Sequence, residues 1–422
     1  MGLEFNEALD RILSNSEVIG TNEVSLFDLY EKAISEDFYS DIDYPKHDIA
    51  TVDGYACRFK DVKCVLTRQV SKLKLATVKH IDNIEEYNLN NKECVKVRAG
   101  SKLPASANVV IPLSSTKKNA LNQILVYKEH LKNDNIKKRG DTLKKGECVI
   151  EAGENINASH IGIFALTGKA KIPIFKKPKV SVIVIGEGFV NSEMHFSFKK
   201  NNNEFYDANG PMICSLCKRL DADVEYLGTI KPDKTKIRAK IQKALKGDIV
   251  ITTGCLDKGI NHFTKEIIKE FVGKLHVDTV NMVPGGQLVF GKTNDKIIFG
   301  LPGNPAASMV AFYELVRPSI LNLMGRRDLF LSTETAILEN TVEIAPGRTY
   351  FLSGVLKLED DTYYVSIKNT YDLDNIISYV TANCLVPISP KDTYIKKGEK
   401  VTVQRLKPQA WHYYDSITSG KR

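Results

Sequence analysis

Asp248-Ile-Val-Ile-Thr-Thr-Gly254 is the stretch of sequence that decides the fold. Its apolar run predicts a buried strand, which leads into a turn of small residues and then a helix. Strands and helices alternate on both sides of it: strands over Val180 to Ile185 and Val224 to Ile230, and helices near 209 to 219, 233 to 245 and 262 to 272. Because helices cover both faces of such strands, this rhythm predicts a doubly wound parallel sheet.

A second loop of the same kind follows further along, at Phe299-Gly-Leu-Pro-Gly-Asn304-Pro305. Asn304 is suited to cap a helix that begins at Pro305, which would leave free backbone N–H groups pointing outward. Ligands of parallel α/β sheets bind beyond the carboxyl ends of the strands, where loops lead into helices. We therefore expect an anion site at this edge, although helix starts of this kind are common in α/β proteins.

The pattern of apolar and polar residues changes on either side of this region. At the N-terminus, the spacing predicts helices over residues 5 to 14 and over about Leu26 to Ile34. From Pro45 to about residue 135 the pattern is of short β-type runs, such as Cys64 to Leu66 and Cys94 to Val97, and Gly140 to Pro173 returns to turns and a short helix. Residues 335 to 405 carry short alternating strands that predict a small β-barrel.

Bulk composition supports a large chain with several cores. A length of 422 residues, with 43% hydrophobic and 26% charged positions, suggests about three domains. No apolar run approaches the roughly 18 residues needed to cross a bilayer, and Met1 to Leu13 does not form a signal-peptide core. We expect a cytoplasmic protein without a membrane span.

The cysteines and the charge exclude some classes of site. The eight cysteines lie far apart, so reduced thiols are expected, and the one close pair, Cys214 and Cys217, sits in an apolar helical pattern that favours packing over a metal or redox role. The net charge of +8 suits an anionic small molecule as well as nucleic acid. No nucleic-acid module is present, so a solvated basic surface is the simpler interpretation.

Several motifs across the chain together resemble those of one family. Asp48-Ile-Ala-Thr-Val-Asp53-Gly54-Tyr55-Ala56 resembles Asp-Asn-Ser-Ala-Met-Asp-Gly-Tyr-Ala, and Leu103-Pro104 to Val109-Val110 resembles Pro-x-Gly-Ala-Asp-x-Val-Val. Tyr206-Asp207-Ala208-Asn209, Thr252-Thr253-Gly254 with Gly259, Leu301 to Pro305 and Ala382-Asn383 follow in the expected order. Their order and spacing are similar to those of the molybdopterin molybdotransferase family, which includes bacterial MoeA and the gephyrin E domain.

The resemblance implies a multidomain α/β fold with four parts. These are an elongated N-terminal subdomain (1–45 with 140–178), an inserted β-rich domain (46–139), a MogA-like doubly wound molybdopterin-binding domain (179–326) and a C-terminal β-barrel (327–410). It also implies an extended homodimer, with the active cleft between the α/β domain and the partner subunit.

The family's reaction joins molybdate to adenylylated molybdopterin and releases AMP with the help of magnesium. Such chemistry needs carboxylates for the divalent ion, and cations with N–H donors for the oxyanion. The resemblance assigns catalytic positions to Asp53, Glu187, Asp257 and His262, with Asp53 and Glu187 as magnesium ligands. It assigns binding of the pterin and the anion to ten further residues: Asp207, Asn209, Thr253, Gly254, Gly259, Pro302, Gly303, Asn304, Arg348 and Ser378.

The departures from the family pattern concentrate on polar positions. Gly188 stands where a glutamate is expected, His262 where an aspartate is expected, and Val283 and Gly286 where two lysines are expected. Asp53 either organises the metal or simply forms an Asp-Gly turn, and His262 is either a weak ligand or a helix cap. Glycines, prolines and apolar positions persist.

Two functions are therefore open. The first is an enzyme of molybdenum cofactor biosynthesis with a rewired or slow site, acting on molybdate or tungstate. The second is a catalytically silent paralogue that keeps the dimeric fold as a scaffold or platform for a protein partner.

Overall fold

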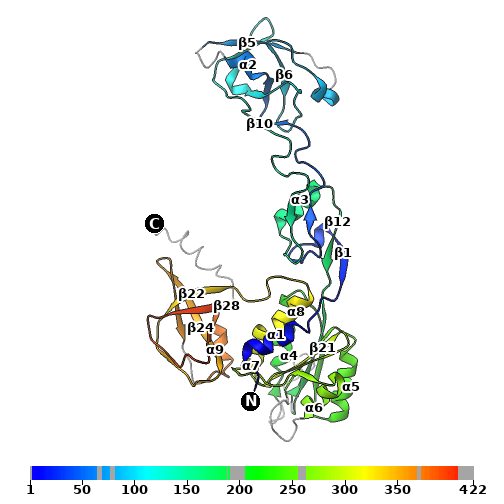
Figure 1. The fold of residues 1–422 in the computed structure, drawn as a ribbon, viewed down its shortest axis with the longest axis vertical. Helices are drawn as coiled ribbons and strands as arrows, with labels where there is room; N and C mark the ends of the chain where they lie inside the picture. The colour runs from blue at the N-terminus through cyan, green and yellow to red at the C-terminus, as the bar shows by residue number, and fades with distance from the viewer. Residues whose placement is uncertain are drawn as a thin grey trace.

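The chain folds into four bodies along an elongated molecule (Figure 1). The structure, a computed structural model, describes residues 2–63, 69–76, 81–187, 189–190, 205–254, 263–367 and 372–406. The sheet that contains β5 (Ser71–Leu75) and β6 (Glu93–Val97) lies at one end, and a smaller body with α3 (Ala158–Leu166) lies in the middle. The α/β sheet and the barrel lie at the other end.

The α/β body is built on a six-stranded sheet in the order β16-β13-β17-β21-β20-β18. Its strands are β13 (Lys179–Ile185), β16 (Asp223–Ile230), β17 (Ile249–Thr253), β18 (Leu275–Val277), β20 (Val289–Thr293) and β21 (Lys296–Leu301). The first four strands in the order are parallel, and β20 and β18 add an antiparallel edge. The predicted doubly wound sheet is confirmed, and the antiparallel edge is an addition to it.

Both faces of this sheet are buried, as the continuous apolar strands predict. On β17, Ile249 and Ile251 belong to one hydrophobic core and Val250 to the core on the opposite face. The helices of this body are α1 (Phe5–Leu13), α4 (Asn209–Arg219), α5 (Lys234–Ala244), α6 (Phe263–Val272), α7 (Pro305–Ala311) and α8 (Arg317–Leu323), with a π-helical turn, η5 (Phe312–Val316), between the last two. The predicted helices near 209, 233 and 262 are thus confirmed.

Helix α1 packs on the α/β body, although it precedes the N-terminal body in the sequence. Ala8 and Ile12 are fully buried in the same core as β13 and β17. The amide Nδ2 of Asn281 donates to Glu4 just before the helix, at 3.0 Å. The four-part division of the chain remains a proposal. Within it, α1 packs on the α/β body, although residues 1–45 are otherwise assigned to the N-terminal body.

The N-terminal body contains two short antiparallel strand pairs and α3. The pairs are β1 (Thr21–Ser25) with β12 (Lys171–Phe175), and β2 (Phe38–Tyr39) with β11 (Cys148–Ile150). The helix predicted over Leu26 to Ile34 is wrong, because only a 3-10 turn, η1 (Leu26–Asp28), forms. Glu31 has a positive φ of 61°, and Ala33 and Ile34 bridge to Asn155 and Ile174. Pairing with residues far along the chain therefore overrides the local helical pattern.

The inserted body is a six-stranded sheet in the order β7-β4-β6-β5-β9-β8. Its other strands are β4 (Gly54–Cys57), β7 (Val109–Pro112), β8 (Thr116–Lys118) and β9 (Gln123–Val126), with helical turns α2 (Phe59–Val62), η3 (Ile81–Glu86) and η4 (Leu113–Ser115), and β3 (Ile49–Ala50) pairs with β10 (Ile136–Lys137) at its base. The predicted strand at Cys94 to Val97 is confirmed, and the one at Cys64 to Leu66 lies outside the described residues.

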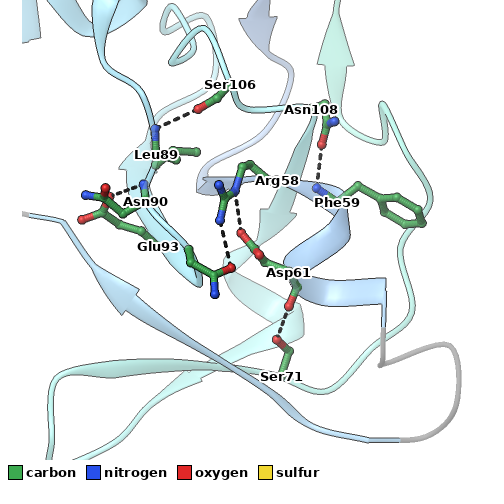
Figure 2. A network of polar contacts seen from close by, with 10 residues as sticks. Arg58, Phe59, Asp61, Ser71, Leu89, Asn90, Glu93, Ser106 and Asn108 are labelled. Carbon is green, nitrogen blue, oxygen red and sulfur yellow. Dashed lines mark hydrogen bonds and ion pairs between the residues drawn. The ribbon is translucent and has the colours of Figure 1, made fainter.

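A polar network holds the start of α2 in the inserted body (Figure 2). Arg58 Nε donates to the buried carboxylate of Asp61 at 2.8 Å, and the Ser71 hydroxyl donates to the Asp61 carbonyl. The backbone N–H of Phe59 donates to Asn108 Oδ1 at 2.6 Å. Every contact lies within this body, so the network serves the internal structure of the inserted domain.

The C-terminal body is a closed barrel. It contains β22 (Thr333–Leu338), β24 (Thr349–Glu359), β25 (Thr362–Ile367), β26 (Cys384–Ile388) and β28 (Lys400–Arg405), and the pairing of β24 with β26 closes it. The strands β23 (Val342–Glu343) and β27 (Tyr394–Ile395) form a separate pair, and α9 (Ile377–Thr381) follows β25. The strand β19 (Met282–Val283) of the α/β body pairs with β24, which couples the two bodies. No helix in the described part of the chain is long and apolar enough to cross a membrane.

A buried carboxyl group lies at the junction of the α/β body and the barrel. Glu314, in the π-helical turn, is 6% exposed and accepts a hydrogen bond from Gln404 of β28 at 3.2 Å. Burial raises the pKa of Glu314 to about 7, and the hydrogen bond and Arg317 offset only part of this effect. The folded protein therefore holds a proton on Glu314 at pH values where an unfolded chain would release it.

The first prediction follows from this proton. The contribution of Glu314 to stability should be complete below the unfolded pKa of about 4.3 and should be lost as the pH rises through 7, a change of about 3 kcal/mol. Glu314→Gln should remove this pH dependence and stabilise the α/β body above pH 7. Urea unfolding at pH 5 and pH 8 measures how the free energy of unfolding changes with pH. Glu225→Gln, which changes an exposed glutamate, is the control. An unchanged difference between the two pH values in Glu314→Gln would contradict the assignment.

Candidate functional site

The candidate site lies where the parallel strands of the α/β sheet end. The strands β13, β17 and β21 are neighbours in register, with Val184 opposite Thr253 and Thr253 opposite Leu301. Their carboxyl ends therefore meet at one edge, as expected for a parallel sheet. The loop after β21 and the starts of α4 and α7 lie at the same edge.

The Asn209 side chain joins two of these loops. Its Nδ2 donates to Thr253 Oγ1 at 2.9 Å and to the Gly303 carbonyl at 2.7 Å, so the start of α4 is tied to the ends of β17 and β21. Its Oδ1 is buried and has no partner among the described residues. Because an unpaired buried oxygen costs about 1 to 3 kcal/mol, we expect a water or ligand donor at this position.

Two buried hydroxyl groups hold the Pro302-Gly303 turn by donating hydrogen bonds to the Pro302 carbonyl. Thr253 Oγ1 donates to the Pro302 carbonyl at 2.8 Å, and Ser308 Oγ, on the first turns of α7, donates to the same carbonyl. Both side chains are fully buried. The turn is therefore a rigid feature of the α/β body.

Gly254 is required by backbone packing. It has a φ of +92°, and a β-carbon built on it would overlap the Ile185 carbonyl oxygen. Any side chain would strain the backbone and push the ends of β13 and β17 apart. The close packing of β13 against β17 is therefore enough to explain why this position is a glycine.

Asp207 is a buried positioning residue. Its carboxylate accepts the Gly210 backbone N–H at 3.0 Å and the Tyr226 hydroxyl at 2.6 Å. A β-carbon at Gly210 would overlap both the Asp207 carboxylate and the Tyr226 ring. Asp207 therefore shapes the first turn of α4 and does not point a free carboxylate at a ligand.

Asn304 caps α7, as the sequence predicts. Its Oδ1 accepts the Ala307 N–H at 3.0 Å, Pro305 is the first helical residue, and Asn304 Nδ2 donates to the Asp374 carbonyl at 3.0 Å. The second bond links the helix start to the loop that precedes α9 of the barrel. One side chain thus orients the helix and fixes the barrel beside it.

A cleft of about 530 Å³ opens beside this helix start, between the α/β body and the barrel. Among the described residues that line it, Arg348 is the one cation and Asp374 the one carboxylate. The remaining lining is neutral: Gly2, Thr279, Val280, Asn281, Met282, Val283, Pro284, Gly285, Gly286, Gln287, Pro302, Gly303, Asn304 and Ala307. The cleft therefore offers N–H donors and a single guanidinium to an anion.

The two positions where lysines are expected differ in the room around them. Val283 is half-buried, lines the cleft and packs against the barrel core, so a lysine there would replace an apolar contact by a charge at the edge of the cleft. A β-carbon at Gly286 would overlap the carbonyl oxygens of Val280 and Met282. The backbone of this chain thus accommodates a lysine at residue 283 but not at residue 286.

The two predicted metal ligands do not meet within one chain. Asp53 precedes β4, where its exposed carboxylate accepts the Ala99 N–H at 2.8 Å. Glu187 is exposed beyond the end of β13. The sheets that carry them lie at opposite ends of the molecule (Figure 1). Among the described residues no group of three His, Cys, Asp or Glu side chains could hold a metal ion, so these residues do not fit magnesium within a single chain.

The remaining predicted positions are placed as follows. Arg348 lines the cleft, whereas Ser378 lies on α9 and is not among the described residues that line it. Asp257, Gly259 and His262 lie outside the described residues, as does Gly188. Cys214 and Cys217 are buried in the main core of the α/β body, in agreement with the packing role expected for them.

Sequence reasoning missed Ser308 and Tyr226, which hold Pro302 and Asp207 in place. A polar residue four positions after the predicted cap, on an apolar helix face, was the available signal for Ser308. Tyr226 gave no such signal, because a tyrosine in a strand is ordinary.

Three family models match the chain in order. The model described as MoeA N-terminal region (domain I and II) matches residues 3–168, and the one described as probable molybdopterin binding domain matches residues 181–322. The model described as MoeA C-terminal region (domain IV) matches residues 335–406. Together these matches extend over most of the chain.

Relatives and solved structures agree with these matches. The chain is 26% identical over 394 residues to the molybdopterin molybdenumtransferase of Haemophilus influenzae, covering 91% of this chain and 93% of the relative. It is 26% identical over 400 residues to that of Staphylococcus aureus, covering 94% of each. The structure is similar to that of the molybdopterin biosynthesis MoeA protein from Pyrococcus horikosii, with a TM-score of 0.80 and 27% identity, covering 97% of this chain and 100% of that one.

The second prediction concerns the cap of α7. Asn304→Ala should lower stability by about 1 kcal/mol and should also weaken binding of molybdopterin, because the helix start and its contact with the barrel loosen together. Asp233→Ala removes the equivalent cap of α5, outside the cleft, and serves as a matched control. It should lower stability by a similar amount and leave binding unchanged. Equal binding by both variants would show that the cleft does not depend on Asn304.

Proposed function

The chain belongs to the MoeA family, whose members act in molybdenum cofactor biosynthesis, and we propose that the cleft beside Asn304 binds adenylylated molybdopterin for insertion of molybdate. The observation that carries this proposal is the turn at Pro302 and Gly303, whose carbonyl groups accept hydrogen bonds from Asn209, Thr253 and Ser308. A capped helix start follows this turn. Backbone N–H groups at such a helix start bind phosphate groups and oxyanions.

We assign the residues around the cleft to three tasks. Asn304 presents the N–H groups of α7, and Arg348 faces them from the barrel as the cation that contacts the anion. Asn209 and Thr253 position the Pro302-Gly303 turn at the end of β21 through their hydrogen bonds to its carbonyl groups. Glu187, just beyond the end of β13, and Ser378, on α9 of the barrel, remain proposed site residues, as do Asp257, Gly259 and His262, which lie outside the described residues.

The polar content of the cleft supports slow catalysis. A tetrahedral oxyanion is stabilised by several preorganised cations and N–H donors, and here one guanidinium is balanced by one carboxylate among the described lining residues. The relatives bear the name molybdopterin molybdenumtransferase, so a transferase is favoured over a catalytically silent scaffold. We propose a transferase with an impaired site, for molybdate or tungstate.

We further propose that the complete site forms between two chains. Asp53 lies too far along the molecule to reach the cleft of its own chain, so its participation requires a second copy. An extended homodimer in which the inserted body of one chain faces the α/β body of the other would bring Asp53 to Glu187. Magnesium enters the proposal only through such a shared site.

The third prediction tests the shared site. Light scattering should show a homodimer at micromolar concentration. At a concentration of adenylylated molybdopterin too low to saturate Asn304→Ala, a mixture of Asp53→Asn chains with Asn304→Ala chains should be faster than either variant alone and reach about a quarter of the wild-type rate, because half of the dimers are mixed and each of these keeps one intact site. Each variant alone, carried through the same exchange procedure, is the control. A monomer, or a mixture as inactive as its parts, would rule out the shared site.

The fourth prediction tests the impaired site. Molybdenum insertion should be slower than in a relative that keeps both lysines by at least about 10²-fold, whereas binding of adenylylated molybdopterin should remain measurable. Val283→Lys should raise the rate about 10-fold by adding a cation to the cleft. Gly286→Lys should not do so, because its β-carbon overlaps the backbone. AMP release and metal incorporation are the readouts, and a normal rate in the unmodified chain would contradict the proposal.

A further inference from the structure

We propose that a second cavity, lined by arginines, binds a small organic anion that carries a phosphate group and a flat ring. The cavity measures about 880 Å³ and shares no lining residue with the cleft beside Asn304. This volume lies within the range of small-molecule sites in proteins. The proposal is independent of the reaction assigned to the cleft.

The cavity lies where all the bodies except the inserted one meet. Its lining comes from the N-terminal body (Tyr30, Asn155), from α4 and α8 of the α/β body (Arg219, Arg317), from the segment between α8 and β22 (Arg326, Phe330), and from β28 of the barrel (Arg405). A molecule bound here would contact all of these elements at once. It would therefore fix the barrel and the N-terminal body relative to the α/β body.

Two of the four guanidinium groups have carboxylate partners and two do not. Arg326 Nε donates to Asp328 at 2.8 Å, and Arg405 lies 3.0 Å from Glu334. Among the described residues, Arg219 contacts only the Leu406 carbonyl, at 3.4 Å, and Arg317 only the Leu329 carbonyl. Neither Arg219 nor Arg317 therefore forms a direct ion pair among the described residues, although the carboxylates of Glu31 and Asp328 also line the cavity.

These cations act on one another and on the hydroxyl of the half-buried Tyr313. Burial lowers the pKa of Arg317, and Arg326 and Arg219 lower it further, although Asp328 and Glu314 act in the opposite direction. Burial also raises the pKa of Tyr313, which lines the cavity, while Arg219 and Arg317 lower it. The three guanidinium groups therefore face a common space, where a bound anion would relieve their repulsion.

The shape and lining of the cavity define the class of ligand. Guanidinium groups bind phosphate oxygens in pairs, which makes a phosphate the anion that best matches Arg219 and Arg317. The apolar part of the lining combines six aliphatic side chains with aromatic ones: Phe312 is buried, and Phe330 and Tyr30 are 54% and 60% exposed at the surface. Aromatic side chains of this kind stack on flat rings. A phosphate ester of a ring compound satisfies both parts.

The fifth prediction uses phenyl phosphate as the probe, with inorganic phosphate and phenol as its separate halves. Calorimetry with the full chain should show binding of phenyl phosphate that weakens as salt is added, and no binding of phenol. Arg219→Gln and Arg317→Gln should each weaken binding by about 10-fold or more, the scale of one lost charge-assisted hydrogen bond. Phenyl phosphate should also raise the melting temperature of the wild-type chain. If Arg317→Gln does not fold, Arg219→Gln, whose side chain is exposed, carries the test.

Two further variants locate the probe. Arg327→Gln changes an exposed arginine next to Arg326 but outside the cavity, and Arg348→Gln removes the cation of the cleft. Both should bind phenyl phosphate as the wild type does. If Arg348→Gln weakens the binding of phenyl phosphate and Arg219→Gln does not, the probe binds in the cleft and the proposal is overturned. Absence of binding would overturn it as well, including the case in which a second copy of the chain covers Arg219.

Discussion

The bond between the Asn209 amide and the loops at the end of the sheet is the contact on which the candidate site depends. It joins Thr253 and Gly303, and through them α4, β17 and the start of α7. The close approach of Gly254 to Ile185 sets the separation of the ends of β13 and β17. The buried Ser308 hydroxyl holds the turn by donating to the Pro302 carbonyl. Because Asn209, Thr253, Gly254 and Ser308 are buried, the α/β core decides the shape of this side of the cleft.

The parts of the fold that could be predicted from the sequence are those governed by local rules. The alternation of apolar strands with helices is a local pattern, and α4, α5 and α6 follow from it, as the cap of α7 follows from Asn304 and Pro305. The resemblance to a known family added the order of the four parts, which no periodicity could supply. The helix expected over 26–34 failed because its backbone pairs with residues near 155 and 174, and a local pattern cannot foresee a distant partner.

The candidate site was predictable only in part, for a similar reason. Asn209, Thr253 and Asn304 converge because they end neighbouring strands or begin the following helices, and the topology of a parallel sheet dictates this. Asp53 is assigned by motif alone, and its sheet lies at the far end of the molecule. The cavity with Arg219 and Arg317 has no motif, because its lining comes from segments that meet only in the folded chain.

The central claim is that the cleft retains the elements that hold a pterin phosphate and has lost those that hold the oxyanion. The most direct test is a crystal structure of the chain with adenylylated molybdopterin and excess molybdate, with anomalous scattering to locate molybdenum. The claim predicts pterin phosphate density against the N–H groups of α7, beside Gly303 and Asn304, and molybdenum at low occupancy. Full molybdenum occupancy in the cleft, or pterin bound elsewhere on the chain, would contradict it.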